Sequence, residues 1–370
     1  MKLLKRAGAC LMAAALLASL AACHPKDETA MTIGDVQITS ALYMCALISA
    51  DGEGRNAVDE AKQAESSESG DTTSTNSSST TDYYSEEIDG TDFSTWVRNR
   101  AEELCKQYAA YETRFAEAGL TLDEETQAEI DSNLDMLWNT YGYSSIYEPN
   151  GVSFETYTKY FTYQYKADEY FMSIYGQDGT DPVPEEEIKT SLAENYVAAE
   201  TLTGAYTTTD STTGSSTPLS DDEKTALKEK FEGYAQRLRD GESFETIYVE
   251  QNASPLTASE DGAQNPYISI LGAEDTSYAS DNFEEVKNMA VGEVKVLEDE
   301  TYGLTLVVRQ DILADSYYYD NLKDQALYTL KQEEFENAIT EFGNSLTMEK
   351  SDFAINRFKP KNIKYPEGAY

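Results

Sequence analysis

The chain has 370 residues, 11 % of them aromatic, which is enough for two or three domains with packed cores. Its formal net charge is −40, from 68 Asp and Glu against 28 Lys and Arg. A charge of this sign excludes nucleic acid as a partner, because neutralising phosphates requires clustered Lys and Arg. It also argues against electrostatic adhesion to anionic lipid.

The N-terminal segment combines three basic residues with the apolar run Ala9–Ala22. The run is too short to cross a hydrocarbon core of ~30 Å as a helix and is typical of a signal peptide. The Leu-Ala-Ala-Cys tetrapeptide ending at Cys23 resembles the lipobox of bacterial lipoproteins; an ordinary secretory signal is the alternative. We expect a lipoprotein signal peptide over 1–22, lipidation of Cys23 and a tether over 23–30. The protein would then be extracytoplasmic and lipid-anchored to the cell membrane of a bacterium.

Cysteine and histidine are scarce. Once Cys10 leaves with the signal and Cys23 is acylated, Cys45 and Cys105 remain, either as a disulfide in an oxidising compartment or as two buried free thiols. The one histidine, His24, lies on the tether, so we expect neither a Cys/His zinc site nor a Ser-His-Asp triad. No nucleotide-binding glycine motif is present either. We expect no metal and no other cofactor.

The first half of the chain has mainly helical periodicity. Gly34 between β-branched residues predicts a small hairpin, followed by an apolar helix capped by Thr39 or Ser40. Residues 60–90, acidic and rich in Ser and Thr, predict a disordered insertion. Further helices are expected over 92–118, from Thr121, over 153–175 and over 184–195. The Thr121 helix has a capping-box spacing.

The second half changes pattern. Alternating apolar residues and turn signals predict strands over 196–206, 266–272, 293–297 and 304–312, with helices over 220–239 and 282–290 and a short one near Phe244 and Ile247. Residues 316–346 then have the period of one long helix. We expect the tail, 351–370, to be polar and loose.

Five local motifs in this order resemble the extracytoplasmic parvulin-type foldases, the PrsA/SurA-like lipoproteins and periplasmic chaperones. The resemblance covers about residues 31–345 and rests on Ala118–Asp123, Pro182–Ile188, Leu238–Phe244, Phe283–Val294 and Thr301–Val308. It implies an α+β fold with a mainly helical SurA/trigger-factor-like chaperone domain, 31–195 plus 313–350. A degenerate parvulin-like module, 196–312, would be inserted into it.

The resemblance breaks at the active site. Active parvulins carry two histidines on adjacent strands, and here the corresponding positions are Glu200 and Thr305. These two side chains either hydrogen-bond each other or leave Glu200 facing solvent. Because prolyl isomerisation needs no covalent chemistry, activity is not excluded, but we expect it to be weak or absent.

The sequence therefore predicts a membrane-anchored foldase or chaperone for unfolded or nascent secreted polypeptides. The alternatives are an active peptidyl-prolyl cis-trans isomerase without histidines, and a surface or solute-binding lipoprotein. Tyr157, Tyr160, Tyr165 and Tyr206 are the candidate peptide-binding residues, because tyrosine offers rigid amphipathic contact. Core packing between helices is the other explanation for the aromatic stripe over 157–175.

Overall fold

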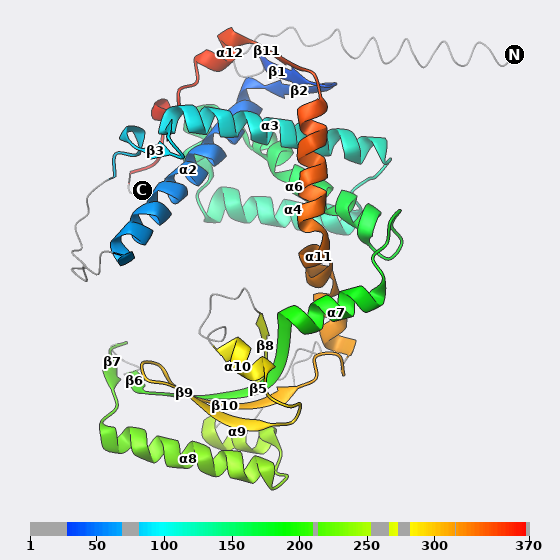
Figure 1. Ribbon diagram of the computed structural model, residues 1–370. Helices are drawn as coiled ribbons and strands as arrows, with labels where there is room; N and C mark the ends of the chain where they lie inside the picture. The colour runs from blue at the N-terminus through cyan, green and yellow to red at the C-terminus, as the bar shows by residue number, and fades with distance from the viewer. Residues whose placement is uncertain are drawn as a thin grey trace, which may run out of the picture. The chain divides into compact units, whose positions relative to one another are not determined.

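The computed structural model describes residues 28–68, 81–209, 214–252, 266–272, 282–314 and 316–367 (Figure 1). The chain divides into two compact units. Unit 1 comprises the chain up to Asp181 together with Glu333–Tyr370, and unit 2 comprises Pro182–Gln332. Each unit has its own hydrophobic core.

A three-stranded antiparallel sheet in the order β11-β1-β2 lies in unit 1. β1 (Thr29–Ile33) and β2 (Val36–Thr39) form the predicted hairpin, and its turn contains Gly34 at a φ of +58°, which glycine adopts at low cost. β11 (Met348–Lys350) pairs with β1, so the sheet joins the start of the described chain to a segment near its end.

Long helices form most of the rest of unit 1: α2 (Ser40–Glu68), α3 (Phe93–Glu117), α4 (Glu124–Asp135) and α6 (Phe154–Tyr175). Asp92 caps α3 and Ser153 caps α6 through side-chain oxygens that accept from backbone N–H groups, as expected. The predicted capping box from Thr121 is wrong. Asp123 caps α4 instead, accepting from Thr126 N at 2.8 Å, because its carboxylate directly precedes the first helical residue.

The predicted insertion over 60–90 is too wide. α2 continues to Glu68, and the described chain resumes at Thr81 with ordered short elements; residues 69–80 lie outside the described residues. The short elements of unit 1 are η1 (Tyr83–Ser85), β3 (Glu87–Ile88), β4 (Thr91–Asp92), the π-helical turn η2 (Met136–Thr140), α5 (Ser144–Tyr147), η3 (Glu148–Asn150), α12 (Asp352–Asn356) and η5 (Pro360–Asn362).

The expectation of a loose tail over 351–370 is wrong for residues 351–367, the part of the tail that the structure describes. Ala354 and Ile355 of α12 are buried in the core of unit 1, and the ring of Phe358 lies 6.3 Å from that of Tyr43. The Tyr365 hydroxyl donates to a carboxylate of α2 at 2.7 Å. A few buried apolar residues and one tyrosine hydroxyl therefore fix the segment.

Unit 2 contains a four-stranded antiparallel sheet in the order β8-β5-β10-β9. Its strands are β5 (Tyr196–Ala205), β8 (Ile268–Gly272), β9 (Val294–Asp299) and β10 (Gly303–Gln310), close to the predicted ones. A two-stranded ribbon of β6 (Thr207–Thr209) and β7 (Ser216–Pro218) follows β5.

Helices cover both faces of this sheet. α8 (Asp221–Arg239), the expected helix, begins at a capping box formed by Ser220 and Glu223, and it packs on one face together with α9 (Phe244–Asn252). There, Phe231 and Ile247 are buried with Leu202 of β5. α10 (Phe283–Lys287) packs on the other face, where Val286 is buried with Val307 of β10. α7 (Glu185–Asn195) precedes β5.

α11 (Ser316–Ser345) begins in unit 2 and ends in unit 1. In unit 2 its Ala326 is buried with Leu192 of α7, so both helices belong to the unit. Unit 2 is consequently wider than the predicted 196–312 module. In unit 1, the Phe335 ring packs edge-on against Phe171 of α6, with centroids 5.2 Å apart.

Candidate functional site

The candidate site is a cavity on the α10 face of the unit 2 sheet. β5 and β10 pair in a register that sets Thr203 opposite Thr305 and Thr201 opposite Val307. Since side chains alternate between the faces of a strand, these four share one face. Leu202 and its neighbours point to the opposite face, into the core beneath α8.

The cavity has a volume of about 120 Å³, which is smaller than a typical ligand pocket and has room for a single small side chain. Its described lining is Thr201, Thr203, Ser269, Leu271, Asn282, Val286, Thr305 and Val307. Hydroxyl groups from three strands thus meet an apolar wall from β8, β10 and α10. Such a surface suits a small apolar side chain attached to a hydrogen-bonding backbone.

The hydroxyl groups differ in their partners. Thr201 Oγ1 and Ser269 Oγ lie 2.7 Å apart and satisfy each other. Thr305 Oγ1 is buried and has no hydrogen-bond partner among the described residues. An unmade hydrogen bond of a buried hydroxyl costs about 1–3 kcal/mol. Thr305 therefore has a hydroxyl beside the cavity whose hydrogen-bonding capacity no described residue uses.

Among the described residues that line the cavity, no side chain titrates near neutral pH. General acid–base catalysis needs such a group within hydrogen-bond reach of the reacting atoms. The described lining can bind and orient a group, but it supplies neither a general acid nor a general base.

Neither expectation for Glu200 is correct. Glu200 pairs with Val308 in the β5–β10 register, so it points away from Thr305 and cannot bond to it. Nor does it face open solvent: its side chain is half-buried and accepts from Gln310 Nε2 at 3.0 Å. The physical reason is the two-residue period of a strand, which sets positions 200 and 201 on opposite faces.

Burial raises the pKa of Glu200 above its usual value, and the Gln310 hydrogen bond opposes the shift in part. A carboxyl whose pKa is higher in the folded state loses stabilisation as the pH rises through that raised value. We therefore expect Glu200→Gln to gain stability relative to the parent chain as the pH rises from about 4 to neutrality. Hydrogen exchange of β5 amides over a pH series measures this.

Glu298→Gln is the matched control. Hydrogen bonds from Lys228 and Tyr206 lower the pKa of Glu298, so this variant should lose relative stability as the pH rises to about 5 and should change no further above that pH. Parallel slopes for the two variants would contradict at least one of the two pKa directions.

The expectation of a peptide-binding surface is wrong for three of the four tyrosines, which are buried, and it stays a prediction for the half-buried Tyr165. Tyr157 and Tyr160 are buried in the unit 1 core, and Tyr165 accepts from Asn133 Nδ2 at 2.6 Å. Tyr206 is buried in unit 2, where its hydroxyl donates to Glu298 at 2.7 Å. A run of tyrosines on α6 closes the space between helices, and this packing explains the stripe.

Cys45 and Cys105 are both buried free thiols. The structure therefore has two buried free thiols rather than a disulfide between Cys45 and Cys105. Burial raises the pKa of each thiol, which keeps both protonated and unreactive.

The lipidation site Cys23 and the adjoining His24 lie outside the described residues, so their roles stay predictions. In the part of the chain that is described, no helix is both long and apolar enough to cross a bilayer. The same residues contain no group of His, Cys, Asp and Glu side chains arranged to hold a metal ion.

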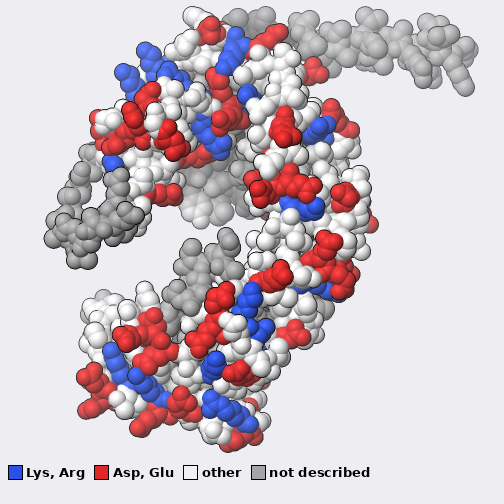
Figure 2. Space-filling view, in the orientation of Figure 1, with Lys and Arg blue, Asp and Glu red and all other residues white. Residues whose placement is uncertain are grey.

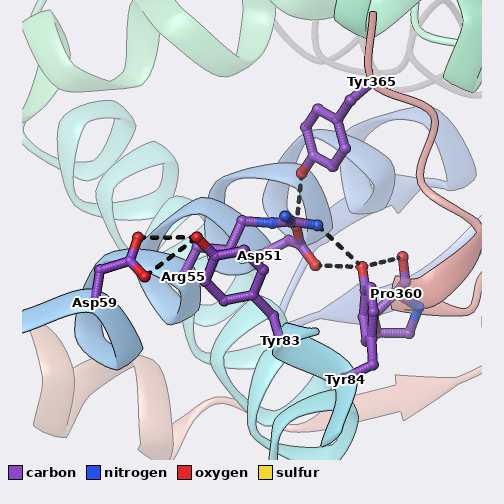
Figure 3. Close-up of polar contacts among 7 residues, drawn as sticks. All are labelled: Asp51, Arg55, Asp59, Tyr83, Tyr84, Pro360 and Tyr365. Carbon is purple, nitrogen blue, oxygen red and sulfur yellow. Dashed lines mark hydrogen bonds and ion pairs between the residues drawn. The ribbon is translucent and has the colours of Figure 1, made fainter. Parts of the chain in front are cut away.

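A buried polar cluster in unit 1 escaped the sequence analysis (Figure 3). Asp51 is fully buried and forms an ion pair with Arg55 at 2.7 Å, one helical turn along α2. Tyr84 and Tyr365 bring their hydroxyls to within 2.8 and 2.7 Å of the same carboxylate. The Tyr84 hydroxyl also lies 2.9 Å from the carbonyl oxygen of Pro360.

This cluster is structural. It ties α2, η1 and the C-terminal tail together, and the Arg55 guanidinium lies 4.7 Å from the ring centroid of Tyr83. Its one sequence signal was the acid–base spacing of four residues in a helix, which is common on exposed helices and says nothing about burial. The cavity residues Thr201 and Thr203 had a weaker signal, the alternation of threonine along the strand.

The chain matches no family model, and no curated protein matches its sequence. Solved structures with similar arrangements are the foldase protein PrsA from Streptococcus pneumoniae (13 % identity, TM-score 0.38), PrsA from Bacillus subtilis (16 %, 0.27) and the foldase protein PrsA from Lactococcus lactis (12 %, 0.37). The alignments cover 70, 69 and 88 % of this chain and 88, 88 and 96 % of those chains, respectively.

Proposed function

We propose that this protein is a membrane-anchored, extracytoplasmic foldase or chaperone of secreted polypeptides, with weak or no prolyl isomerase activity. The observation that carries the proposal is the unit 2 cavity. It combines an apolar wall with unsatisfied hydrogen-bonding capacity at Thr305, and its described lining has no acid–base group.

In this role, the cavity binds one apolar side chain of an extended polypeptide. The side chain packs against Val286 and Val307, and Thr305 Oγ1 donates to a backbone carbonyl of the client. Burying a Val- or Leu-sized side chain is worth about 1.5–3 kcal/mol. Binding at one such pocket is therefore weak and reversible, which suits a helper that must release its client.

Aggregation of a denatured client, followed by light scattering, tests this function. The chain from His24 onward keeps every described residue and should suppress scattering at several-fold excess over the client. Thr203 is exposed at the cavity and lies in a strand, where an aromatic residue is well tolerated. We expect Thr203→Phe to fill the cavity and weaken suppression at least twofold.

Thr208→Phe on β6 is the matched control, since Thr208 is also exposed in a strand but does not line the cavity. It should suppress aggregation as the parent chain does. No suppression by the parent chain would contradict the proposal and leave the solute-binding alternative.

An active isomerase without histidines is the second candidate, and Thr305 is the observation that favours it. A buried hydroxyl that binds the carbonyl before a proline can hold the peptide in a twisted geometry. The barrier to be lowered is about 18–20 kcal/mol. One neutral hydrogen bond is worth about 0.5–1.5 kcal/mol net, too little to accelerate the reaction by much.

A further inference from the structure

The C-terminal tail carries a charge opposite to that of the whole chain. Residues 351–367 contain four Lys or Arg and two Asp or Glu, in a chain with a net charge of −40. Lys359, Lys361 and Lys364 are exposed, and none of them forms an ion pair within the described part of the chain. Figure 2 shows Lys and Arg side chains gathered near the α12 end of unit 1.

The fold holds these lysines outward. The intervening Pro360 is buried, and its carbonyl oxygen lies 2.9 Å from the Tyr84 hydroxyl. Tyr365 is fixed by Asp51, as described above (Figure 3). With the inward residues anchored, Lys359, Lys361 and Lys364 are exposed on a fixed segment, and the Lys364 ammonium also donates to Pro149 O at 3.2 Å.

An exposed aromatic side chain accompanies the charges. Phe353 on α12 is 78 % exposed, while its neighbours Ala354 and Ile355 are buried. It lies four residues before Arg357, whose guanidinium is 3.1 Å from Glu28. Exposed aromatic side chains on segments that also carry cations are typical of surfaces that lie at a membrane interface.

The same end of unit 1 receives the chain from the predicted lipid anchor. Glu28 contacts Arg357, and Ser351 N donates to Ala30 O at 2.9 Å. Glu28 is the fifth residue after Cys23, and an extended chain of five residues reaches at most about 18 Å. If Cys23 carries a lipid, the tail is held close to the headgroups.

We propose that this surface, Phe353, Arg357, Lys359, Lys361 and Lys364, docks on anionic phospholipid headgroups. The inference rests on the proposed lipid anchor at Cys23, which would orient this surface toward the membrane. The acidic remainder of the molecule does not prevent docking, because charges farther away than the Debye length of about 10 Å at 0.1 M salt are largely screened. Within the tail itself, over residues 351–367, basic residues outnumber acidic ones by two.

Vesicle flotation with the anchor-free chain from His24 onward tests the proposal. The chain should float with vesicles that contain phosphatidylglycerol, should float less as salt is added, and should not float with phosphatidylcholine alone. Each lysine near an anionic surface contributes roughly fivefold in partitioning. The triple variant Lys359→Gln, Lys361→Gln, Lys364→Gln should therefore partition at least about tenfold less.

A second triple variant, Lys224→Gln, Lys228→Gln, Lys230→Gln, removes the same charge from α8 in unit 2 and should float as the parent chain does. Equal losses in the two triple variants, or no preference of the parent chain for anionic vesicles, would overturn the proposal. The tail variant should still suppress client aggregation. The flotation assay tests the docking surface and the aggregation assay tests the proposed function, so a negative result in one does not require a negative result in the other.

Discussion

Asp51→Ala is expected to lower the free energy of unfolding by about 3–5 kcal/mol, because it leaves the Arg55 charge buried without its partner. The Asp51 carboxylate is fully buried and also accepts from Tyr365. The variant thus also removes one of the contacts that hold the C-terminal tail. Both tryptophans of the chain, Trp96 and Trp138, lie in unit 1. Denaturant unfolding followed by tryptophan fluorescence therefore measures the effect directly.

Lys159→Ala is the control for this prediction. Lys159 forms an ion pair with Glu155 at the same spacing of four residues, but both side chains are largely exposed. Exposed helical pairs are worth about 0.3–0.5 kcal/mol. If Asp51→Ala cost no more than Lys159→Ala, the burial of the cluster in Figure 3 would be refuted.

Phe231→Ala is expected to destabilise unit 2 by about 3–5 kcal/mol, the usual cost of emptying a phenylalanine site in a core. The Phe231 ring is fully buried between α8 and the sheet, and it fills the space above Gly204. Hydrogen exchange of the β5 and β10 amides measures the loss. Tryptophan fluorescence reports on unit 1 in the same sample.

Gly204→Ala tests the same contact from the other side. A Cβ at this position would lie 2.6 Å from the Phe231 ring, so the ring must move and we expect a loss of about 1–3 kcal/mol. Phe231→Leu should lower the free energy of unfolding less in the Gly204→Ala variant than in the parent chain. Additive losses would show that the ring and Gly204 do not touch.

Much of the fold followed from local chemistry. The helix at Ser153, the Ser220 capping box, the Gly34 hairpin and the strands of unit 2 each have a signal within a few residues. The boundaries of unit 2 have no such local signal. They depend on the burial of Leu192 together with Ala326, which lie far apart in the chain. The packed tail was missed for the same reason, since its fixed points are single residues such as Pro360.

The candidate site was only partly predictable. The sequence placed Thr305 correctly on a strand of the sheet, and the structure places it in the cavity. The sequence analysis paired Thr305 with Glu200, which lies on the opposite face of the sheet. Alignment of a motif does not determine which face of a strand a side chain occupies. Thr201, the next residue, lines the cavity. The aromatic residues of α6 were ambiguous, since amphipathic tyrosine serves equally in packing and in binding.

The central claim is that the unit 2 cavity binds polypeptide without catalysing prolyl isomerisation. A protease-coupled assay with a proline-containing peptide, on the chain from His24 onward, tests this most directly. At protein concentrations that suppress client aggregation, we expect the isomerisation rate to equal that in buffer. A rate that rises in proportion to protein concentration, and that Thr203→Phe abolishes, would contradict the claim and identify the cavity as an active site.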